Sequence, residues 1–224
     1  LGKDSENLKA IGSRFIYFRG AWSDTEAIMI SADLLINDEK DKSDQKVLET
    51  YQSRLQASEW GWQWEFSNPT IPAYGIDEDY QNSDQQHWFI TCHRCNHSMF
   101  IDFEPSGYHN HFVDVDAEVY RCGKCKRVLA DEDRQNGEWV ARYRMETHPD
   151  IKIRGYWLSQ MIVPYVPASY IVAKWNRGKG DQDFFHNMVL GKPYQPADMQ
   201  ITREMILKNA SPGEADQTHL CLGV

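Results

Sequence analysis

The sequence contains no run of about eighteen apolar residues, and its first residues, LGKDSENLKAIG, lack the basic and apolar regions of a signal peptide. These absences argue against a membrane-spanning segment and against a visible secretion signal. Positive charge is also scarce: 24 Lys and Arg stand against 33 Asp and Glu, a formal net charge of −9. This net charge argues against a protein whose whole surface wraps nucleic acid. It is compatible with a local basic patch.

The glycine-rich phosphate loop G-x-x-x-x-G-K-[ST] occurs nowhere in the 224 residues. The sequence begins with Leu1 rather than Met and stops in the apolar stretch from His219 to Val224, so we expect a fragment of a longer protein. Cysteine is limited to five residues, four of them in two C-x-x-C pairs and the fifth a lone Cys221. In a chain without a secretion signal, such pairs favour a metal site over disulfides. The expected compartment is a reducing cytoplasm.

The composition is that of a folded protein. Hydrophobic residues make up 41% of the sequence and aromatic residues 12%, which suits one large domain or one and a half. Disordered, collagen-like, coiled-coil and low-complexity classes are therefore excluded.

A strand–helix–strand pattern occupies the first third of the chain. Residues 14–18 and 28–36 have the composition of strands, and apolar residues recur at helical spacing from 47 to 55, with Ser43 as the expected N-cap. Aromatic and polar residues then alternate over 60–66, which predicts a further strand. Such a unit is most simply a right-handed parallel crossover.

Polar residues follow both strands of this crossover: Asp38 and Glu39 after the first, Ser67 and Asn68 after the second. Because ligands bind at the carboxyl ends of parallel strands, we expect the two pairs to be neighbours at one edge. A nucleotide hydrolase needs one carboxylate to hold Mg²⁺ and another to deprotonate the attacking water. The alternative is that both pairs are ordinary turns into solvent.

Trp60, Trp62 and Trp64 alternate with polar residues and therefore share one face of their predicted strand. Core packing is the commoner use of such a face, and we expect it here. The alternative is a surface on which the bases of single-stranded nucleic acid stack.

The clearest motif is the pair of knuckles formed by Cys92 with Cys95 and by Cys122 with Cys125. Four thiolates form the closed tetrahedral shell of structural zinc, and a closed shell leaves no position for catalysis. Two disulfides, a redox C-x-x-C or coincidence are the alternatives. Nearby histidines are spare ligands that we expect to be surface or hydrogen-bonded side chains. They are His93, His97, His109 and His111.

The second knuckle is basic. Its cations are Arg121, Lys124, Lys126 and Arg127. We expect a solvated surface, with contact to phosphate as the alternative.

The region from about 84 to 133 is predicted to be a small inserted module. Its short strands are expected at 87–90, 100–103 and 119–121. Farther along, helical spacing predicts helices around 171–175 and over 184–190, the second ended by Gly191 and Pro193. Residues 209–217 are composed like a linker.

Several stretches together resemble the large terminase subunit of tailed bacteriophages, in the gpA-like branch with an inserted zinc ribbon. They are FIYFRGAWSDTEAIMISADLLINDEKDKS, ETYQSRLQASEWGWQWEFSNPTIP, SDQQHWFITCHRCNH, RGYWLSQMIVPYVP and FHNMVLGKPY, and they run over nearly the whole chain. The resemblance implies an α/β fold: a partial P-loop (ASCE-type) ATPase parallel sheet with an inserted zinc ribbon and a following helical subdomain. It divides the chain into the later half of the ATPase core (1–83), the ribbon (84–135), the rest of the ATPase with its helical subdomain (136–208), and a linker with the start of the first nuclease strand (209–224).

The resemblance also implies roles for individual residues. Asp38 is the Walker B carboxylate that holds Mg²⁺, Glu39 is the general base for water, and Ser67 and Asn68 form the coupling motif that senses the hydrolysis state. The implied cofactors are Mg²⁺ and ATP, besides structural zinc. The implied partners are double-stranded DNA, the small terminase subunit and the portal of the procapsid, with the working motor an oligomeric ring in the host cytoplasm and no membrane.

In that family, the parent protein hydrolyses ATP to move double-stranded DNA into the procapsid and cuts concatemeric DNA with an endonuclease. Asn37 departs from the family pattern, which usually has an apolar residue there. Thr218 to Val224 resembles the first nuclease strand, so the fragment, lacking the phosphate loop and the nuclease residues, is expected to be inactive alone. The alternatives are a non-enzymatic zinc-ribbon module that binds nucleic acid or protein, and a host helicase or recombination ATPase.

Overall fold

The computed structural model describes residues 5–22, 25, 30–103, 112–177 and 182–196. The chain divides into two units, Leu1–Tyr194 and Gln195–Val224. The predictions for 209–224, including Cys221, and for His109 and His111 lie outside the described residues. Within the described part, no helix is long and apolar enough to cross a membrane.

The first unit begins with an antiparallel hairpin of β1 (Leu8–Ile11) and β2 (Arg14–Tyr17). Gly12 takes a φ of 61° in the connecting turn, a conformation that glycine adopts without steric cost. β2 confirms the strand predicted at 14–18, whereas β1 was not predicted.

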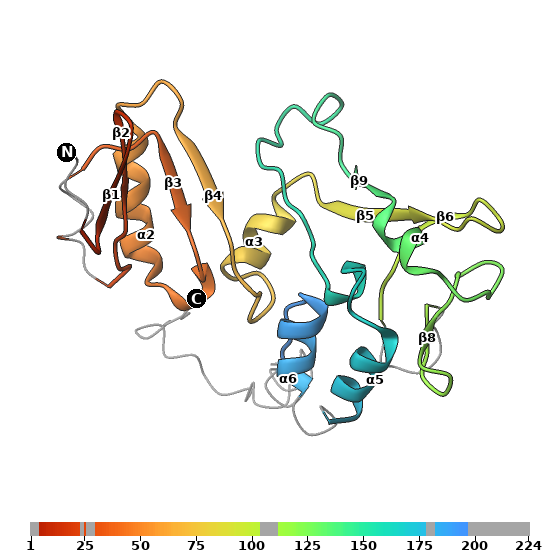
Figure 1. Ribbon diagram of the computed structural model, residues 1–224. Coiled ribbons are helices and arrows are strands. Elements are labelled where there is room, and N and C mark those ends of the chain that lie inside the picture. Colours follow the sequence, from red (N-terminus) through yellow and green to blue (C-terminus); the bar gives the residue numbers. More distant parts are fainter. Residues whose placement is uncertain (1–4, 23–24, 26–29, 104–111, 178–181, 197–224) are drawn as a thin grey trace, which may run out of the picture. The chain divides into compact units, whose positions relative to one another are not determined.

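The predicted parallel crossover is confirmed. β3 (Leu34–Asn37) and β4 (Trp62–Glu65) pair in parallel, with Leu34 opposite Trp62 and Asn37 opposite Glu65. The connection runs through the 3₁₀ turn η1 (Lys40–Lys42), the helix α2 (Gln45–Gln52) and the 3₁₀ turn η2 (Ser53–Leu55). Figure 1 shows the two strands pointing the same way, with α2 beside them.

Two details of this crossover differ from prediction. The first strand begins only at Leu34, because the backbone N–H of Ala32 donates to the carbonyl of Arg54 and not to a neighbouring strand. The N-cap of α2 is Asp44 and not Ser43, since the Asp44 carboxylate accepts a hydrogen bond of 2.9 Å from the backbone N–H of Lys46.

The aromatic face of β4 is exposed, so the prediction that its tryptophans pack in the core is wrong for this structure. Trp60, Trp62 and Trp64 are 61%, 55% and 51% exposed. The physical reason is the alternation of the pleat: α2 contacts β3 and buries Val47 and Leu48, while the side chains at every second position face away.

A three-stranded antiparallel sheet follows α3 (Ile76–Gln81). Its three strands have the order β6-β5-β9. Their bounds are Ser98–Phe100 for β6, Gln86–Thr91 for β5 and Gly137–Ala141 for β9. β5 confirms the strand predicted at 87–90, and β6 ends where the next predicted strand was to start. β9 pairs with β5 although it lies beyond the predicted ribbon boundary at 135.

The cysteine knuckles lie at the ends of short strands. β7 (Val113–Asp114) and β8 (Val119–Tyr120) form a two-stranded sheet, and β8 confirms the strand predicted at 119–121. The helix α4 (Asp131–Gln135) then leads into β9.

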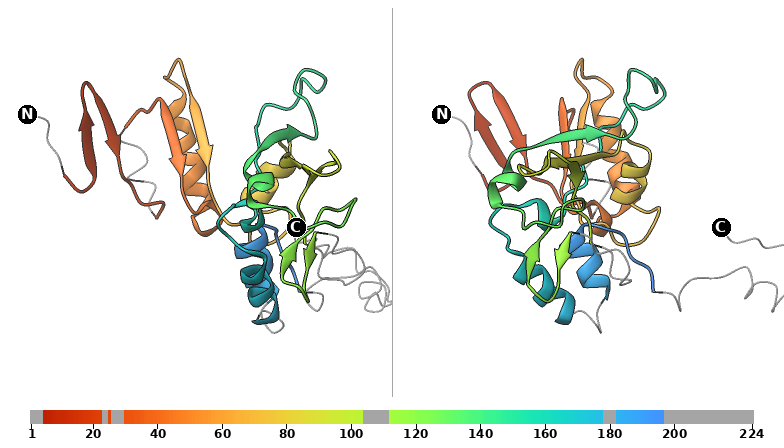
Figure 2. Two further views of the ribbon diagram at one scale, coloured as in Figure 1. Left: turned by 45° about the vertical axis from the view of Figure 1, so that its right-hand side comes forward. Right: turned by 90° about the vertical axis from the view of Figure 1, so that its right-hand side faces the viewer.

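The last described elements are helical, as predicted. The 3₁₀ turn η3 (Gln160–Ile162) precedes α5 (Ala168–Arg177), and α6 (Gln182–Phe184) continues as the π-helix η5 (Phe185–Leu190), which ends at Gly191 with a φ of 64°. Figure 2 shows α5 and the blue α6–η5 helix side by side.

One hydrophobic cluster joins the ribbon to these helices. It includes Ile90, Ile101, Phe103, Ile171 and Phe185, each no more than 1% exposed. Arg134, also 1% exposed, donates hydrogen bonds to four backbone carbonyls between residues 161 and 166, and its guanidinium lies 4.4 Å from the ring centre of Tyr120. Ribbon and helices therefore share a core.

Candidate functional site

The first candidate site is the turn that follows β3. Asp38 and Glu39 are both exposed, and the backbone N–H of Glu39 donates to Oδ1 of Asp38 at 3.1 Å. Glu39 has a φ of 55°, an uncommon left-handed conformation for a residue other than glycine. Its carboxylate lies 3.0 Å from Nζ of Lys42. Both carboxylates are thus open to a ligand, and one already has a cation beside it.

Asn37, the departure from the family pattern, has a local explanation. The residue is 7% exposed, and its side-chain amide donates to Oε1 of Glu65 on the paired strand at 2.9 Å. A polar side chain is tolerated at this buried position because it is hydrogen-bonded across the two strands.

The structure brings the Ser67–Asn68 turn beside the acidic turn, as the crossover predicted. The backbone N–H of Phe66 donates to Asn37 O at 2.8 Å, and that of Lys40 donates to Phe66 O at 3.1 Å. The backbone pairing thus continues past both strand ends, and the two polar segments run out from the sheet together.

Asp41 is the residue of this site that sequence analysis missed. It is 8% exposed. Its backbone N–H donates to the hydroxyl of Ser67 at 3.1 Å, and its carboxylate accepts hydrogen bonds from Thr70 and from the backbone N–H of Ile76. In the sequence Asp41 is one of several charges in a loop, and no local pattern distinguishes it from its neighbours.

The turn is also tied to α3 by an ion pair. Nζ of Lys40 contacts Oδ2 of Asp79, and both side chains are largely withdrawn from solvent. Three residues after the end of α3, the backbone N–H of Asp84 donates to Ile153 O at 3.0 Å, and its carboxylate accepts from the backbone N–H of Gly155 at 3.0 Å. Hydrogen bonds therefore connect the acidic turn, α3 and the segment that follows β9.

The second candidate site is a metal centre. The sulfur atoms of Cys92, Cys95, Cys122 and Cys125 all lie within 4.8 Å of one another, with 3.9 Å between Cys92 and Cys125 and 3.7 Å between Cys95 and Cys122. A tetrahedral zinc ion with Zn–S bonds of about 2.3 Å requires sulfur–sulfur distances of about 3.8 Å. The four cysteines fit a structural zinc ion, and their sulfurs are too far apart for disulfides.

The protein environment acts on the thiols themselves. The backbone N–H of Arg127, followed by the neighbouring thiols, lowers the pKa of Cys125 to about 7. The backbone N–H of His97 acts in the same direction on Cys95, but burial and the other thiols raise its pKa to about 11. A thiolate is the form that binds zinc, so the backbone N–H of Arg127 favours the metal-binding form of Cys125.

The spare histidines and the cations of the knuckles have separate roles. Nδ1 of His93 lies 2.9 Å from both carboxylate oxygens of Asp133, which confirms the prediction of a hydrogen-bonded side chain. Arg94, Lys124 and Arg127 are exposed at the knuckles. These side chains are suited to contact solvent or a polyanion and take no part in the four-sulfur cluster.

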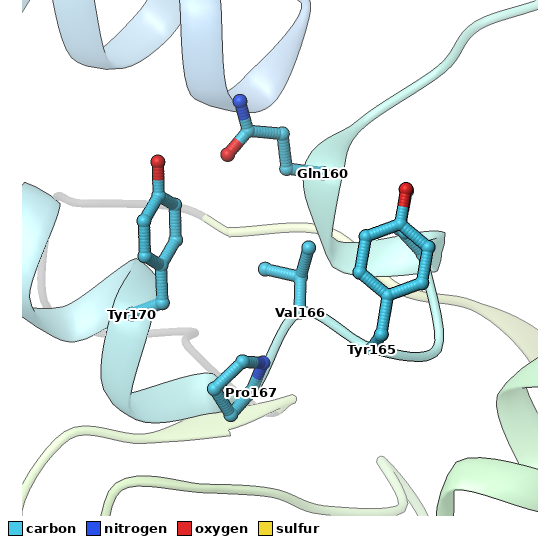
Figure 3. A pocket seen from close by; sticks show the side chains of 6 residues that line it. Gln160, Tyr165, Val166, Pro167 and Tyr170 are labelled. Carbon is cyan, nitrogen blue, oxygen red and sulfur yellow. The ribbon is translucent and has the colours of Figure 1, made fainter.

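A pocket of about 420 Å³ lies apart from both sites (Figure 3). Tyr165 and Tyr170 flank it, with Val166 and Pro167 between them and Gln160 above. Among the described residues that line it there is no acid, histidine or cysteine, so these residues offer no group for acid–base or metal chemistry.

Comparison with known families gives a match. The model of the family described as phage terminase large subunit gpA, ATPase domain, matches residues 3–142, which include both the acidic turn and the four cysteines. No curated protein and no solved structure matched the chain.

Proposed function

The chain belongs to the family of the ATPase domain of phage terminase large subunit gpA, and from this premise we propose that Asp38 and Glu39 are its nucleotide-hydrolysing carboxylates. The single observation that carries the proposal is the exposed acidic turn at the carboxyl end of β3, hydrogen-bonded beside the Ser67–Asn68 turn at the end of β4. In parallel sheets this edge is where nucleotides bind.

The two carboxylates take different parts in the proposed reaction. Asp38 would hold Mg²⁺, which neutralises charge on the phosphates of ATP when both are bound. Glu39 would orient the attacking water and accept its proton. Nζ of Lys42 lies 3.0 Å from the Glu39 carboxylate, so this ion pair would have to open to leave the carboxylate free for the water. Ser67 and Asn68 would sense which nucleotide is bound.

The proposed motor works on double-stranded DNA together with the small terminase subunit and the portal of the procapsid, as a ring in the host cytoplasm. Its grip on DNA would rest on phosphate contacts, which carry no sequence information and therefore permit translocation along any genome. An endonuclease that cuts concatemeric DNA completes the proposed enzyme, with residues outside the site described above. The four cysteines would bind zinc as a structural ion.

The test is Glu39→Ala in the full-length terminase large subunit that carries this chain. Loss of a positioned general base lowers turnover by about a hundredfold or more, while ATP binding is retained because Asp38 is intact. Steady-state hydrolysis and equilibrium binding of a fluorescent ATP analogue measure the two effects. Glu59→Ala removes another exposed glutamate and is the matched control. Unchanged turnover in Glu39→Ala would refute the proposal.

A second candidate function is a non-enzymatic zinc-ribbon module that binds nucleic acid or protein. The exposed cations Arg94, Lys124 and Arg127 favour it. In this case Asp38 and Glu39 can both be replaced by Ala without loss of function, whereas Cys92→Ser unfolds the ribbon. The hydrolysis measurement above separates the two candidates.

A further inference from the structure

The acidic turn and the Ser67–Asn68 turn are joined by one buried carboxylate, that of Asp41. Oδ2 of Asp41 accepts two hydrogen bonds of 2.9 Å from Thr70, one from the backbone N–H and one from the hydroxyl. Oδ1 accepts a bond of 2.7 Å from the backbone N–H of Ile76, the first residue of α3. Asp41 lies two residues after Glu39, and Thr70 lies two residues after Asn68.

The chemistry of this contact requires a carboxylate. An ionised Asp is an acceptor at both oxygens, so three donors can be satisfied at once, whereas Asn presents an N–H₂ group to one of them. The surroundings also leave no room for a larger neighbour. Gly75 has a φ of 58°, and a Cβ atom added to it would lie 2.3 Å from Oδ1 of Asp41.

The same short segment holds α3 at two points. Asp41 binds the backbone at the start of the helix, and the preceding Lys40 contacts Asp79 within it. A displacement of residues 38–41 would therefore act on both the 67–70 turn and α3. Hydrogen bonds to groups that bear a charge are stronger than neutral ones, which makes the connection stiff.

We propose that Asp41 is a positioning residue that fixes the Ser67–Asn68 turn and α3 to the Asp38–Glu39 turn, so that the three respond as one body to the nucleotide. This inference rests on the proposed function of the two turns. It adds a residue that does not touch nucleotide and acts through Thr70 and Ile76. Misplacement of reacting groups by about 1 Å costs about a hundredfold in rate, so loss of this link is expected to lower kcat.

The experiment compares Asp41→Asn, Thr70→Val and Thr70→Ser in the full-length terminase large subunit. ATP turnover is expressed per molecule that binds the fluorescent ATP analogue, which corrects for any unfolded fraction. We expect Asp41→Asn to lower kcat by about tenfold or more, with KM for ATP changed by less than about twofold. Thr70→Val removes only the hydrogen bond from the hydroxyl, and we expect a smaller fall in its kcat. Thr70→Ser keeps the hydroxyl, and we expect its kcat to match that of the wild type.

The controls make the inference separable from the proposed function. Thr147→Val removes a hydroxyl that donates to a backbone carbonyl in another turn, and its kcat is expected to match the wild type. If Glu39→Ala abolishes hydrolysis but Asp41→Asn keeps the wild-type kcat, the link is refuted and the hydrolytic site stands. The link is also refuted if Asp41→Asn raises KM without lowering kcat, or if Thr70→Ser is as slow as Thr70→Val. Unchanged hydrolysis in Glu39→Ala refutes the hydrolytic site itself.

Discussion

Arg134 is a charged side chain whose whole surroundings are protein. It binds backbone carbonyls of the 161–166 segment, pairs with Asp131 at 2.7 Å and lies over Tyr120. Segments that lie far apart in the sequence are held by a single guanidinium, because its fixed fork of N–H donors can reach several carbonyls at once.

Replacing Arg134 by Leu removes a buried donor from four backbone carbonyls. We expect the free energy of unfolding to fall by about 3 kcal/mol, within the range for broken buried charge contacts. Urea unfolding monitored by circular dichroism measures this change. Arg144→Leu replaces an exposed arginine and is expected to change stability by less than about 0.5 kcal/mol. Equal effects of the two substitutions would contradict this account of Arg134.

His87 links pH to stability. Burial among Phe100 and Trp157 is the main cause that lowers its pKa below the usual 6.5, and a hydrogen bond to Gln85 O only partly opposes it. The unfolded chain therefore binds a proton more readily than the folded chain between the two pKa values. This contribution to stability is complete above pH 6.5 and is lost as the pH falls toward the folded-state pKa.

The corresponding prediction concerns His87→Phe, which keeps a ring but cannot titrate. Between about pH 7.5 and about pH 5, the loss of unfolding free energy should be smaller in the variant than in the wild type. Urea unfolding at a series of pH values provides the comparison. Parallel pH profiles for the two proteins would show that His87 does not contribute.

The sequence predicts functional residues where a residue type recurs at a characteristic spacing, or where polar residues directly follow an apolar strand. The four cysteines were identified by spacing, and Asp38 and Glu39 by their place after an apolar run. Asp41 and Arg134 were missed because most of their hydrogen-bond partners are backbone groups, which every residue carries, and because those backbone partners lie tens of residues away. No local pattern encodes such contacts.

At the scale of elements, the strands around the four cysteines are short. β7 and β8 contribute two paired positions, Val113 with Tyr120 and Asp114 with Val119. A two-stranded hairpin of ordinary length is at best marginally stable in water. We therefore expect a metal ion bound by the four cysteines to stabilise the knuckles.

Removing zinc with a chelator is expected to open the knuckles. Binding free energy on the order of 10 kcal/mol holds small zinc modules together. Tryptic cleavage after Lys124 and Lys126 should accelerate strongly, and Cys122→Ser should reproduce the effect without chelator. Cleavage after Lys46 in α2 serves as the internal control and should keep its rate. If knuckle cleavage is as slow without metal as with it, the ribbon does not need zinc.

Element type was predictable where periodicity was strong. Alternation over 60–66 and helical spacing at 171–175 gave the right elements, because both patterns follow from backbone geometry alone. Which face of β4 is buried was predicted wrongly, since hydrophobicity shows that a face is apolar but not which neighbour covers it. α2 packs on the side of the sheet that carries Asn37, leaving Trp62 and Trp64 exposed.

At the scale of the whole molecule, charge limits how DNA can be approached. A net charge of −9 repels a polyanion, so any contact with DNA must be local. The exposed cations of the two knuckles meet this requirement, because Arg94 and Lys124 belong to opposite knuckles whose sulfurs lie within 4.8 Å of one another.

The double substitution Arg94→Glu with Lys124→Glu should therefore weaken binding of the full-length protein to double-stranded DNA by about tenfold or more. It should also reduce the slope of log affinity against log salt by about 2, or about 1 for each phosphate contact. Fluorescence anisotropy over a salt series measures both quantities, with zinc content checked in parallel. Arg144→Glu with Lys152→Glu changes the net charge equally. If both double variants lose the same affinity, total charge and not the knuckle surface governs binding.

The exposed tryptophans in and next to β4 provide a fluorescence signal close to the candidate site. Indole emission shifts to the red in water and to the blue when protein covers the ring, and dissolved iodide quenches only rings that it can reach. Trp60, Trp62 and Trp64 are each more than half exposed beside the strands that carry the acidic and Ser67–Asn68 turns. A partner that covers this face is therefore expected to shift the tryptophan emission to the blue and to reduce its quenching by iodide.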